Sequence, residues 1–393
     1  MHPFLQECGF MAKDTFLMLS QQDFPSNARD DSLVQRQIEQ RLDDWLRLSR
    51  YAYAPNTLKA YKQDWAIFFT WCFEFTDLTG KPSPKQSLPA SPDTIIAFIQ
   101  SQIGYRAPAS LRRCLSSISK IHSAAGVNNP LGDEFVNTAK KEIGRGLVRS
   151  LHKNRPHHNL GSEQRQAKGL TWSHLLRIKE LLPVSPLKER QDLTVRQATT
   201  ARRQNGIWLK NARDRALIHL AYDSLIRVCE IVTLTLDDLD VQADGTALLQ
   251  IRERKDPREG EIAKAYLAPD TVKEIQRWLA MSTIISGPLF CSVTKSGNIR
   301  KDEYTGVQRP LREPNVLDLF KRTANRIGER SALFSCHSTR VGATQDMLEE
   351  NIDMLAVKQA GRWKSDRMPS RYAKGVEARR DGMAQLSMKK NRG

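Results

Sequence analysis

The first half of the chain repeats its apolar residues with the period of an α-helix. Between about residues 32 and 141 they recur three and four positions apart, which places them on one helix face. The clearest stripe follows the helix-start signal Pro55-Asn56 and comprises Leu58, Tyr61, Trp65, Phe68, Phe69 and Cys72. No alternating pattern typical of strands occurs in this part. We therefore expect an all-α bundle of four or five helices within residues 31–146.

The second half mixes helical patterns with one short stretch typical of strands. Helical periodicity covers about 171–182 and 212–232, and it returns at 315–327, 338–350 and 353–360, with a further short helix around Tyr372. Two β-rich runs, 246–252 and 261–267, flank a polar turn that contains Pro257 and Gly260. Turn residues between two such runs predict an antiparallel hairpin. Residues 292–314 predict a long basic loop, which either contacts a polyanionic partner or is a disordered insertion.

Two stretches lack any apolar period. Residues 1–30 are mixed and polar, which is typical of a flexible arm. Residues 147–168 contain Pro, Gly and an excess of cations, as expected for a basic linker that can follow a nucleic-acid backbone. The chain is therefore interpreted as an arm (1–30), a helical domain (31–146), a linker (147–168) and a second domain (169–393).

The charge of the chain favours a polyanionic partner. Its 393 residues include 61 Lys and Arg against 44 Asp and Glu, a net charge of +17, and this surplus most often indicates nucleic acid. Two predicted helices carry cations beside their apolar stripes. A single cation is commonly only solvated, but on so basic a chain the group predicts phosphate contacts. The candidates are Lys59, Lys62, Arg106, Arg112, Arg113 and Lys120.

Several other classes of protein are not expected. The six cysteines form no CxxC pair and no histidine pair has zinc-finger spacing, so we expect no metal site. The first residues lack the basic and apolar regions of a signal peptide, and no apolar run is long enough for a membrane span. We therefore expect a reducing, cytoplasmic location.

Polar residues of reactive types occur at regular intervals near the end of the chain. His337 and Arg340 lie three apart at a predicted helix start, a place that favours anions. Trp363 and Tyr372 follow, and the segment LIRVCEI places Arg227 three residues before Glu230. Each of these residues alone could be structural, Trp363 as a packing residue and the HxxR pair as a chance match. Their combined order and spacing indicate a reactive site.

These segments resemble the tyrosine site-specific recombinases, the phage integrase family, and most closely its Cre-like members. The resemblance extends from about residue 50 to 386 and is strongest in HSTRVGATQDM and QAGRW, with a tyrosine nine residues after the tryptophan. It implies a mainly α fold with a small antiparallel sheet. It also implies a C-shaped clamp made of a core-binding bundle and a catalytic domain.

The resemblance implies a role for each reactive residue. Tyr372 would attack a DNA phosphate and form a 3′-phosphotyrosine, while Arg227 and Arg340 would hold the non-bridging oxygens. Arginine suits that position because its planar fork pairs with two oxygens and keeps its charge. His337 would donate to the phosphate, and Lys255 in the hairpin turn would protonate the leaving 5′-oxygen, with Lys264 a weaker candidate.

The remaining implied features concern support, partners and cofactors. Trp363 would pack the nucleophile's helix and donate to phosphate, and Glu230 would orient an arginine or the lysine. No cofactor is implied, neither metal nor ATP, because two arginines, a lysine and a histidine supply the positive charge. The implied partners are a palindromic duplex and three further copies, each docked through a terminal helix with Met383 and Leu386. Further candidate DNA contacts are Arg312 and Asn315.

Three other interpretations stay open at this point. A DNA-relaxing enzyme would share the chemistry without site choice or a tetramer. A non-catalytic DNA-binding regulator on the same fold would not need every reactive residue that is present. A basic helical scaffold would need none of them.

Overall fold

The computed structural model describes residues 30–77, 79–145, 166–184, 195–252, 262–379 and 382–390. The predicted arm, most of the predicted linker and the candidate Lys255 lie outside these residues. The chain divides into two compact units, Met1–Arg165 and Gln166–Gly393. No helix in the described part of the chain is both long and apolar enough to cross a membrane.

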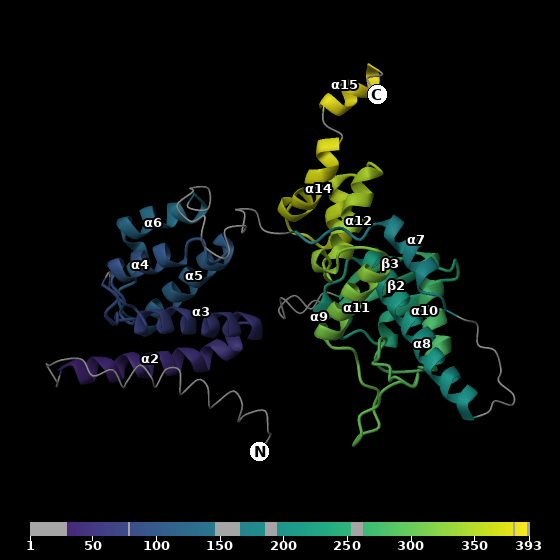
Figure 1. The fold of residues 1–393 in the computed structure, drawn as a ribbon, viewed down its shortest axis with the longest axis horizontal. Helices are drawn as coiled ribbons and strands as arrows, with labels where there is room; N and C mark the ends of the chain where they lie inside the picture. The colour runs from purple at the N-terminus through teal and green to yellow at the C-terminus, as the bar shows by residue number, and fades with distance from the viewer. Residues whose placement is uncertain are drawn as a thin grey trace. The chain divides into compact units, whose positions relative to one another are not determined.

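The first unit is a helical bundle, as the apolar periodicity predicts. Trp65, Phe68, Phe98 and Ile118 are buried at its centre. A prolyl residue stands in the first turn of three of the helices, where its missing N–H costs no helix hydrogen bond. The elements are α2 (Asp30–Ala52), α3 (Pro55–Phe73), α4 (Pro92–Gln102), α5 (Pro108–Ala125), the 3₁₀ turn η2 (Pro130–Gly132) and α6 (Glu134–Arg145) (Figure 1).

The second unit combines helices with a three-stranded antiparallel sheet in the order β1-β2-β3. The strands are β1 (Leu239–Val241), β2 (Ala247–Arg252) and β3 (Ile262–Leu267). The predicted hairpin is confirmed, and Arg252 with Ile262 is its last described pair before residues 253–261. The helices are α7 (Trp172–Leu181), α8 (Val195–Ser224), α9 (Val228–Ile231), α10 (Pro269–Ser282), α11 (Glu313–Arg326), α12 (Ser338–Glu349), α13 (Met354–Gly361), α14 (Arg367–Arg379) and α15 (Gly382–Lys389).

Two elements differ from the sequence prediction. The single helix expected over 212–232 is two helices, because α8 ends at Ser224 and Leu225 takes a left-handed backbone with φ 46°. A chain in that conformation cannot continue a right-handed helix, so α9 begins anew at Val228. The strand β1 was not predicted because three residues are too few to show an alternating pattern.

The basic segment 292–314 is an ordered double hairpin rather than a disordered insertion. Ser292 N–H donates to the Arg309 carbonyl at 2.9 Å, and Arg300 N–H donates to the Ser292 carbonyl at 2.8 Å. The segment also meets α8 closely, since a Cβ added to Gly206 would lie 2.6 Å from the Lys295 carbonyl oxygen. Glycine at this position therefore permits the close contact.

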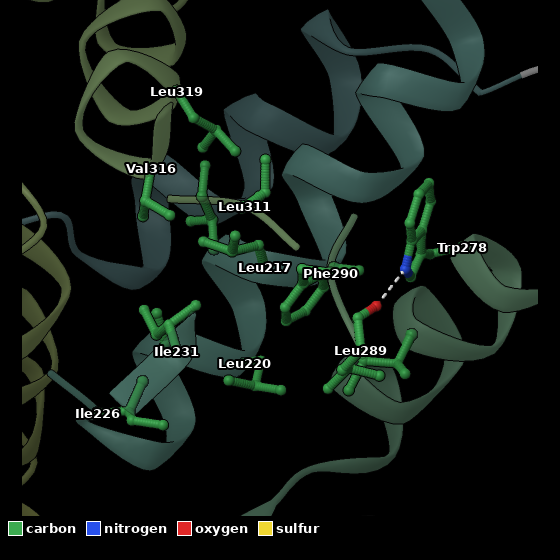
Figure 2. Close-up of a cluster of buried hydrophobic side chains, with 14 of the residues drawn as sticks. Leu217, Leu220, Ile226, Ile231, Trp278, Leu289, Phe290, Leu311, Val316 and Leu319 are labelled. Carbon is green, nitrogen blue, oxygen red and sulfur yellow. Dashed lines mark hydrogen bonds between the residues drawn. The ribbon is translucent and has the colours of Figure 1, made fainter. Parts of the chain in front are cut away.

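An apolar core joins α8, α9, α10 and α11, and the turn between α8 and α9 packs against it. Figure 2 shows Leu217, Ile226, Ile231 and Phe290 facing one another, all of them buried. The Trp278 indole N–H donates to the Leu289 carbonyl at 2.8 Å, which satisfies the one polar atom of that buried ring. Because Ile226 and Ile231 are anchored here, the residues between them are held at a fixed position.

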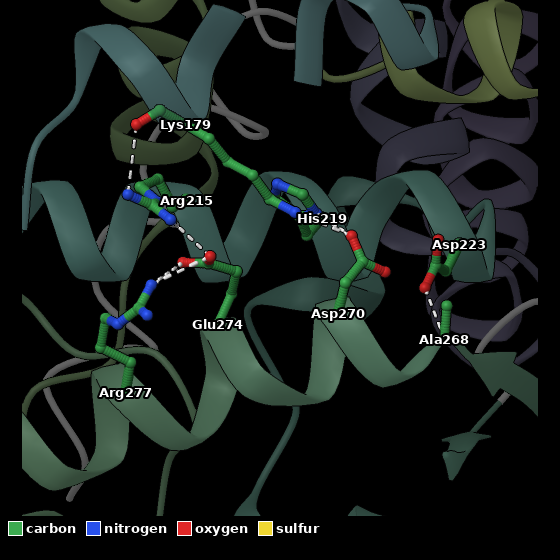
Figure 3. A network of polar contacts seen from close by, with 8 residues as sticks. All are labelled: Lys179, Arg215, His219, Asp223, Ala268, Asp270, Glu274 and Arg277. Carbon is green, nitrogen blue, oxygen red and sulfur yellow. Dashed lines mark hydrogen bonds and ion pairs between the residues drawn. The ribbon is translucent and has the colours of Figure 1, made fainter. Parts of the chain in front are cut away.

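A polar network lies between α7, α8 and α10 (Figure 3). Arg215 is buried and donates to Glu274 and to the Leu182 carbonyl. Lys179 donates to Asp270 at 2.9 Å, and the His219 Nδ1 atom lies 3.7 Å from the same carboxylate. The hydrogen bonds and ion pairs of this network join three helices to one another, and we interpret it as structural.

His219 and Asp223 change the stability of the fold in opposite directions as the pH falls. Burial, and then the charge of Lys179, lowers the pKa of His219 from 6.5 to about 4. Its contribution to stability is present above pH 6.5 and is lost as the pH falls toward 4. Burial raises the pKa of Asp223 from 3.8 to about 6, so its contribution is present at low pH and is lost as the pH rises through 6.

We expect the Asp223→Asn variant to be more sensitive to acid than the parent chain. In this variant His219 still lowers the free energy of unfolding as the pH falls. The opposing rise that Asp223 provides at low pH is absent. Relative to the parent chain, its free energy of unfolding should fall by about 2 kcal/mol between pH 7 and pH 4, at 1.36 kcal/mol per pKa unit. Urea unfolding at both pH values measures this, with His219→Phe as the control expected to shift in the opposite direction. Parallel curves for all three chains would contradict the assignment.

Candidate active site

The turn between α8 and α9 holds Arg227 through Glu230. The Arg227 guanidinium donates from Nη1 to Glu230 Oε1 at 2.8 Å, and its backbone N–H donates to Oε2 at 2.9 Å. Glu230 is 4% exposed, whereas the Arg227 side chain is 28% exposed. A buried carboxylate needs such partners to stay ionised. The pair therefore fixes one face of Arg227 and leaves the guanidinium partly accessible.

Arg340 on α12 connects three segments of the second unit. Its side chain is buried, donating from Nη2 to the Gly361 carbonyl at 3.0 Å and from Nη1 to the Leu225 carbonyl. The Arg340 guanidinium carbon also lies 4.9 Å from the centre of the Trp363 ring, within cation–π range. Burial, with the charges of Arg227 and Arg362, lowers the pKa of Arg340 to about 10, so the group stays charged at neutral pH.

His337 immediately precedes α12 and its side chain is exposed at the surface. Its backbone N–H donates to Ser335 Oγ at 3.1 Å. Partial desolvation, and then the charges of Arg340 and Arg227, lower the pKa of the imidazole. A neutral imidazole can both donate and accept a proton near pH 7.

Tyr372 lies on α14 with its side chain 4% exposed. Its ring meets the Trp363 ring edge-on, with centroids 5.9 Å apart and an interplanar angle of 69°. The Gln345 amide donates to the Tyr372 carbonyl at 3.3 Å and so ties α14 to α12. Burial raises the pKa of Tyr372, and the positive charges of Arg340, Arg371 and Arg227 oppose that rise.

The structure gathers most of the sequence-predicted reactive residues in one unit of a single chain. The charges of Arg227 and Arg340 act on both His337 and Tyr372, so these four groups share one electrostatic environment. Trp363 lies between Arg340 and Tyr372. Lys255 lies outside the described residues, and the weaker candidate Lys264 is an exposed residue of β3.

One arginine of this site was not singled out from the sequence. Arg362 donates from Nη2 to Glu230 Oε2 at 2.8 Å and is one of the few non-glycine residues with a left-handed backbone, at φ 53°. In the sequence it is only an additional cation beside Trp363. No local pattern predicts a partner 132 residues away, because the fold alone brings the two together.

The candidate DNA contacts of the first unit differ in their surroundings. Lys59, Lys62 and Arg112 are exposed. Arg113 donates to Asp64 at 2.8 Å, and because Asp64 is 1% exposed, this arginine also stabilises the bundle. The other two have side-chain contacts as well: Arg106 donates to Gln102 at 2.7 Å, and the Lys120 ammonium lies 5.7 Å from the centre of the Tyr53 ring.

The two candidate contacts of the second unit begin α11. Asn315 accepts from the Arg312 backbone N–H at 3.2 Å, and both side chains are exposed. In this contact the side chain of the third helical residue accepts from the N-cap backbone N–H, as in one half of a capping box. Within the described residues, no cluster of three or more His, Cys, Asp or Glu side chains has the arrangement of a metal site.

Comparison with known protein families defines the class of this protein. Residues 195–379 match the phage integrase family. This range contains all of the reactive residues that the structure brings together. Residues 195–379 therefore form a phage integrase family domain, the domain that the chain shares with the tyrosine recombinases.

Individual relatives agree with this class over nearly the whole chain. An "Integrase/recombinase xerD homolog" of Selenomonas ruminantium is 25% identical over 368 residues, covering 92% of this chain and 90% of the relative. The "Recombinase cre" of Escherichia phage P1 is 20% identical over 361 residues, covering 89% and 92% of the two chains. Both matches extend across the helical bundle as well as the family domain.

A solved structure supports the fold. The XerH site-specific recombinase, solved as a post-cleavage complex with a palindromic difH substrate, superposes with a TM-score of 0.50. It is 15% identical in sequence, and the match covers 84% of this chain and 79% of that one. The predicted fold class, mainly α with a small antiparallel sheet, is therefore confirmed.

Proposed function

We propose that this chain is a site-specific DNA recombinase that cuts and rejoins DNA through a 3′-phosphotyrosine intermediate. The observation that carries the proposal is the placement of Tyr372 beside Trp363 and Arg340 in an environment also influenced by Arg227. Fixed cations near a phenol suit attack on a phosphodiester, because they oppose the rise in the phenol's pKa that burial causes. Developing negative charge is most strongly stabilised by donors that are already in place.

In the proposed reaction the Tyr372 oxygen attacks phosphorus and the 5′-oxygen of the next nucleotide leaves. The phenolic proton passes to a base, for which His337 is the candidate. Arg227 and Arg340 hold the two non-bridging oxygens, and Lys255 supplies the proton that the leaving oxygen takes up. The ester bond energy is kept in the phosphotyrosine, so the 5′-hydroxyl of a second strand can reverse the step and form a new diester without ATP.

The proposed assembly is a tetramer on two target sites that exchanges strands through a four-way junction. Helix α15 supports this part, because Met383 is 61% exposed and Leu386 is 42% exposed. Such side chains on a short terminal helix suit docking on a neighbouring copy. A palindromic target is proposed because two copies related by a twofold axis bind two inverted half-sites, and the XerH structure contains a palindromic substrate.

A nicked DNA duplex tests the chemistry. A nick just beyond the scissile phosphate lets the short 5′-hydroxyl fragment diffuse away, so the protein should remain covalently joined to the 3′ end. Denaturing gels and mass spectrometry of the linked peptide should identify Tyr372. The adduct should also form in the presence of EDTA, because the positive charges proposed to bind the phosphate come from protein side chains and not from a metal ion.

The outcomes of this experiment separate the alternatives. Binding without adduct would support a non-catalytic regulator. Adducts together with relaxation of any supercoiled plasmid, and with no junction intermediates, would support a DNA-relaxing enzyme. Loss of adduct in EDTA would contradict the metal-free mechanism.

A further inference from the structure

The C-terminal end of α13 contacts three functional groups through the consecutive residues 361–363. The Gly361 carbonyl accepts from Arg340, the Arg362 guanidinium donates to Glu230, and the Trp363 ring lies beside both Arg340 and Tyr372. A Cβ on Gly361 would lie 1.9 Å from the Trp363 ring, so the segment is tightly packed. The position of this segment and the position of the reactive groups are therefore mutually dependent.

Arg362 occupies this segment in a conformation that its side chain does not favour. Its backbone is left-handed, with φ 53° and ψ 47°, at the end of α13. Residues with a Cβ rarely adopt this region, and glycine is the common choice where a helix ends in this way. The conformation aims a 10% exposed side chain at the buried Glu230.

Glu230 is thereby held from two directions. Its Oε2 atom accepts from the Arg362 guanidinium and from the Arg227 backbone N–H, while its Oε1 atom accepts from the Arg227 guanidinium. A carboxylate with only Arg227 as its partner could turn with that side chain. A second arginine, attached to a different segment, fixes the plane of the carboxylate and with it the orientation of Arg227.

We propose that Arg362 is a positioning residue that aligns Arg227 for phosphate binding by clamping Glu230. Arg362 acts through Glu230 and does not touch the DNA phosphate. The proposal rests on the proposed function, because its effect appears in the cleavage step. Arg362 also links α9 to the segment that contains Trp363. The positions of Arg227 and of the ring beside Tyr372 are therefore fixed relative to each other.

The Arg362→Gly variant tests this directly, because glycine accepts the left-handed backbone and lacks the side chain that clamps Glu230. With saturating nicked DNA, the rate of adduct formation should fall about 10-fold or more, the size typical for groups that orient a reactive partner. DNA affinity should stay within about 3-fold of the parent chain, since no phosphate contact is removed. Arg362→Lys should recover part of the rate, because it restores the charge without the fork.

A double variant separates an indirect role from a direct one. In the Glu230→Gln background the clamp is already weakened, so adding Arg362→Gly should change the rate by less than about 3-fold. Losses that multiply would overturn the proposal, because Arg362 would then act independently of Glu230. A fall in DNA affinity as large as the fall in rate would also overturn it, since that is the behaviour of a direct phosphate contact.

Thr283→Gly is the matched control. Thr283 also ends a helix, α10, with a left-handed backbone at φ 56°, and it contacts none of the reactive residues described above. Its cleavage rate should equal that of the parent chain. An unchanged rate in Arg362→Gly would overturn the inference while leaving the proposed function intact, whereas a parent chain that forms no adduct would overturn both.

Discussion

Replacing Tyr372 with Phe should abolish the covalent protein–DNA adduct and leave DNA binding in place. The change removes only the hydroxyl, and the ring can keep its edge-on contact with Trp363. Loss of a nucleophile costs at least about 10³-fold in rate, since no neighbouring group replaces the attacking oxygen. Quantitative denaturing gels with a nicked duplex measure the adduct, and gel-shift titration measures binding.

Tyr304→Phe provides the matched control for this experiment. Tyr304 is 97% exposed on the basic hairpin segment and lies outside the reactive cluster. Its adduct yield should equal that of the parent chain. Persistent adduct in Tyr372→Phe would show that another residue is the nucleophile, and linked-peptide mass spectrometry would identify it.

Arg340→Lys should lower the cleavage rate at saturating DNA by about 10²-fold or more. Lysine keeps the charge but cannot reach two backbone carbonyls and a phosphate oxygen with one planar group. Removal of a single preorganised donor to a developing oxyanion costs about this much in other enzymes. Single-turnover cleavage measures the effect.

The stability of the Arg340 variants must be measured together with their rates. The Leu225 and Gly361 carbonyls both accept from Arg340, and a buried acceptor left without a donor costs about 1–3 kcal/mol. Arg340→Ala should therefore unfold more easily than Arg340→Lys. Arg277→Lys, at a half-exposed arginine paired with Glu274, is the control for a general arginine effect. An Arg340→Lys enzyme with unchanged rate would remove Arg340 from the proposed site.

Features that depend on local periodicity were accessible from the sequence. The stripe through Trp65 and Phe68 predicts α3 because those residues face one core. The resemblance implied that Glu230 orients an arginine or the lysine, and the structure shows Glu230 2.8 Å from Arg227. The spacing of His337, Arg340 and Tyr372 indicated a common site because the resemblance to a family fixed their order.

Features that depend on distant contacts were not accessible. Leu225 is an apolar residue inside a helical pattern, and nothing local shows that its backbone turns left-handed with its carbonyl directed to Arg340. Arg362 likewise meets Glu230 only after α9 and α13 have been packed into one domain. Arg113 was predicted only as a phosphate contact, because its buried partner Asp64 lies 49 positions earlier in the chain and no local pattern joins the two.

The burial of Tyr372 has a consequence for copies of the protein that are not engaged with a substrate. A sheltered phenol with a raised pKa keeps its proton and is a poor nucleophile. Under the proposed function, the Tyr372 oxygen would therefore react slowly in a copy that has no DNA bound. DNA binding would then have to bring a phosphate to this oxygen, and any movement of the ring that this requires would add to the free-energy cost of cleavage.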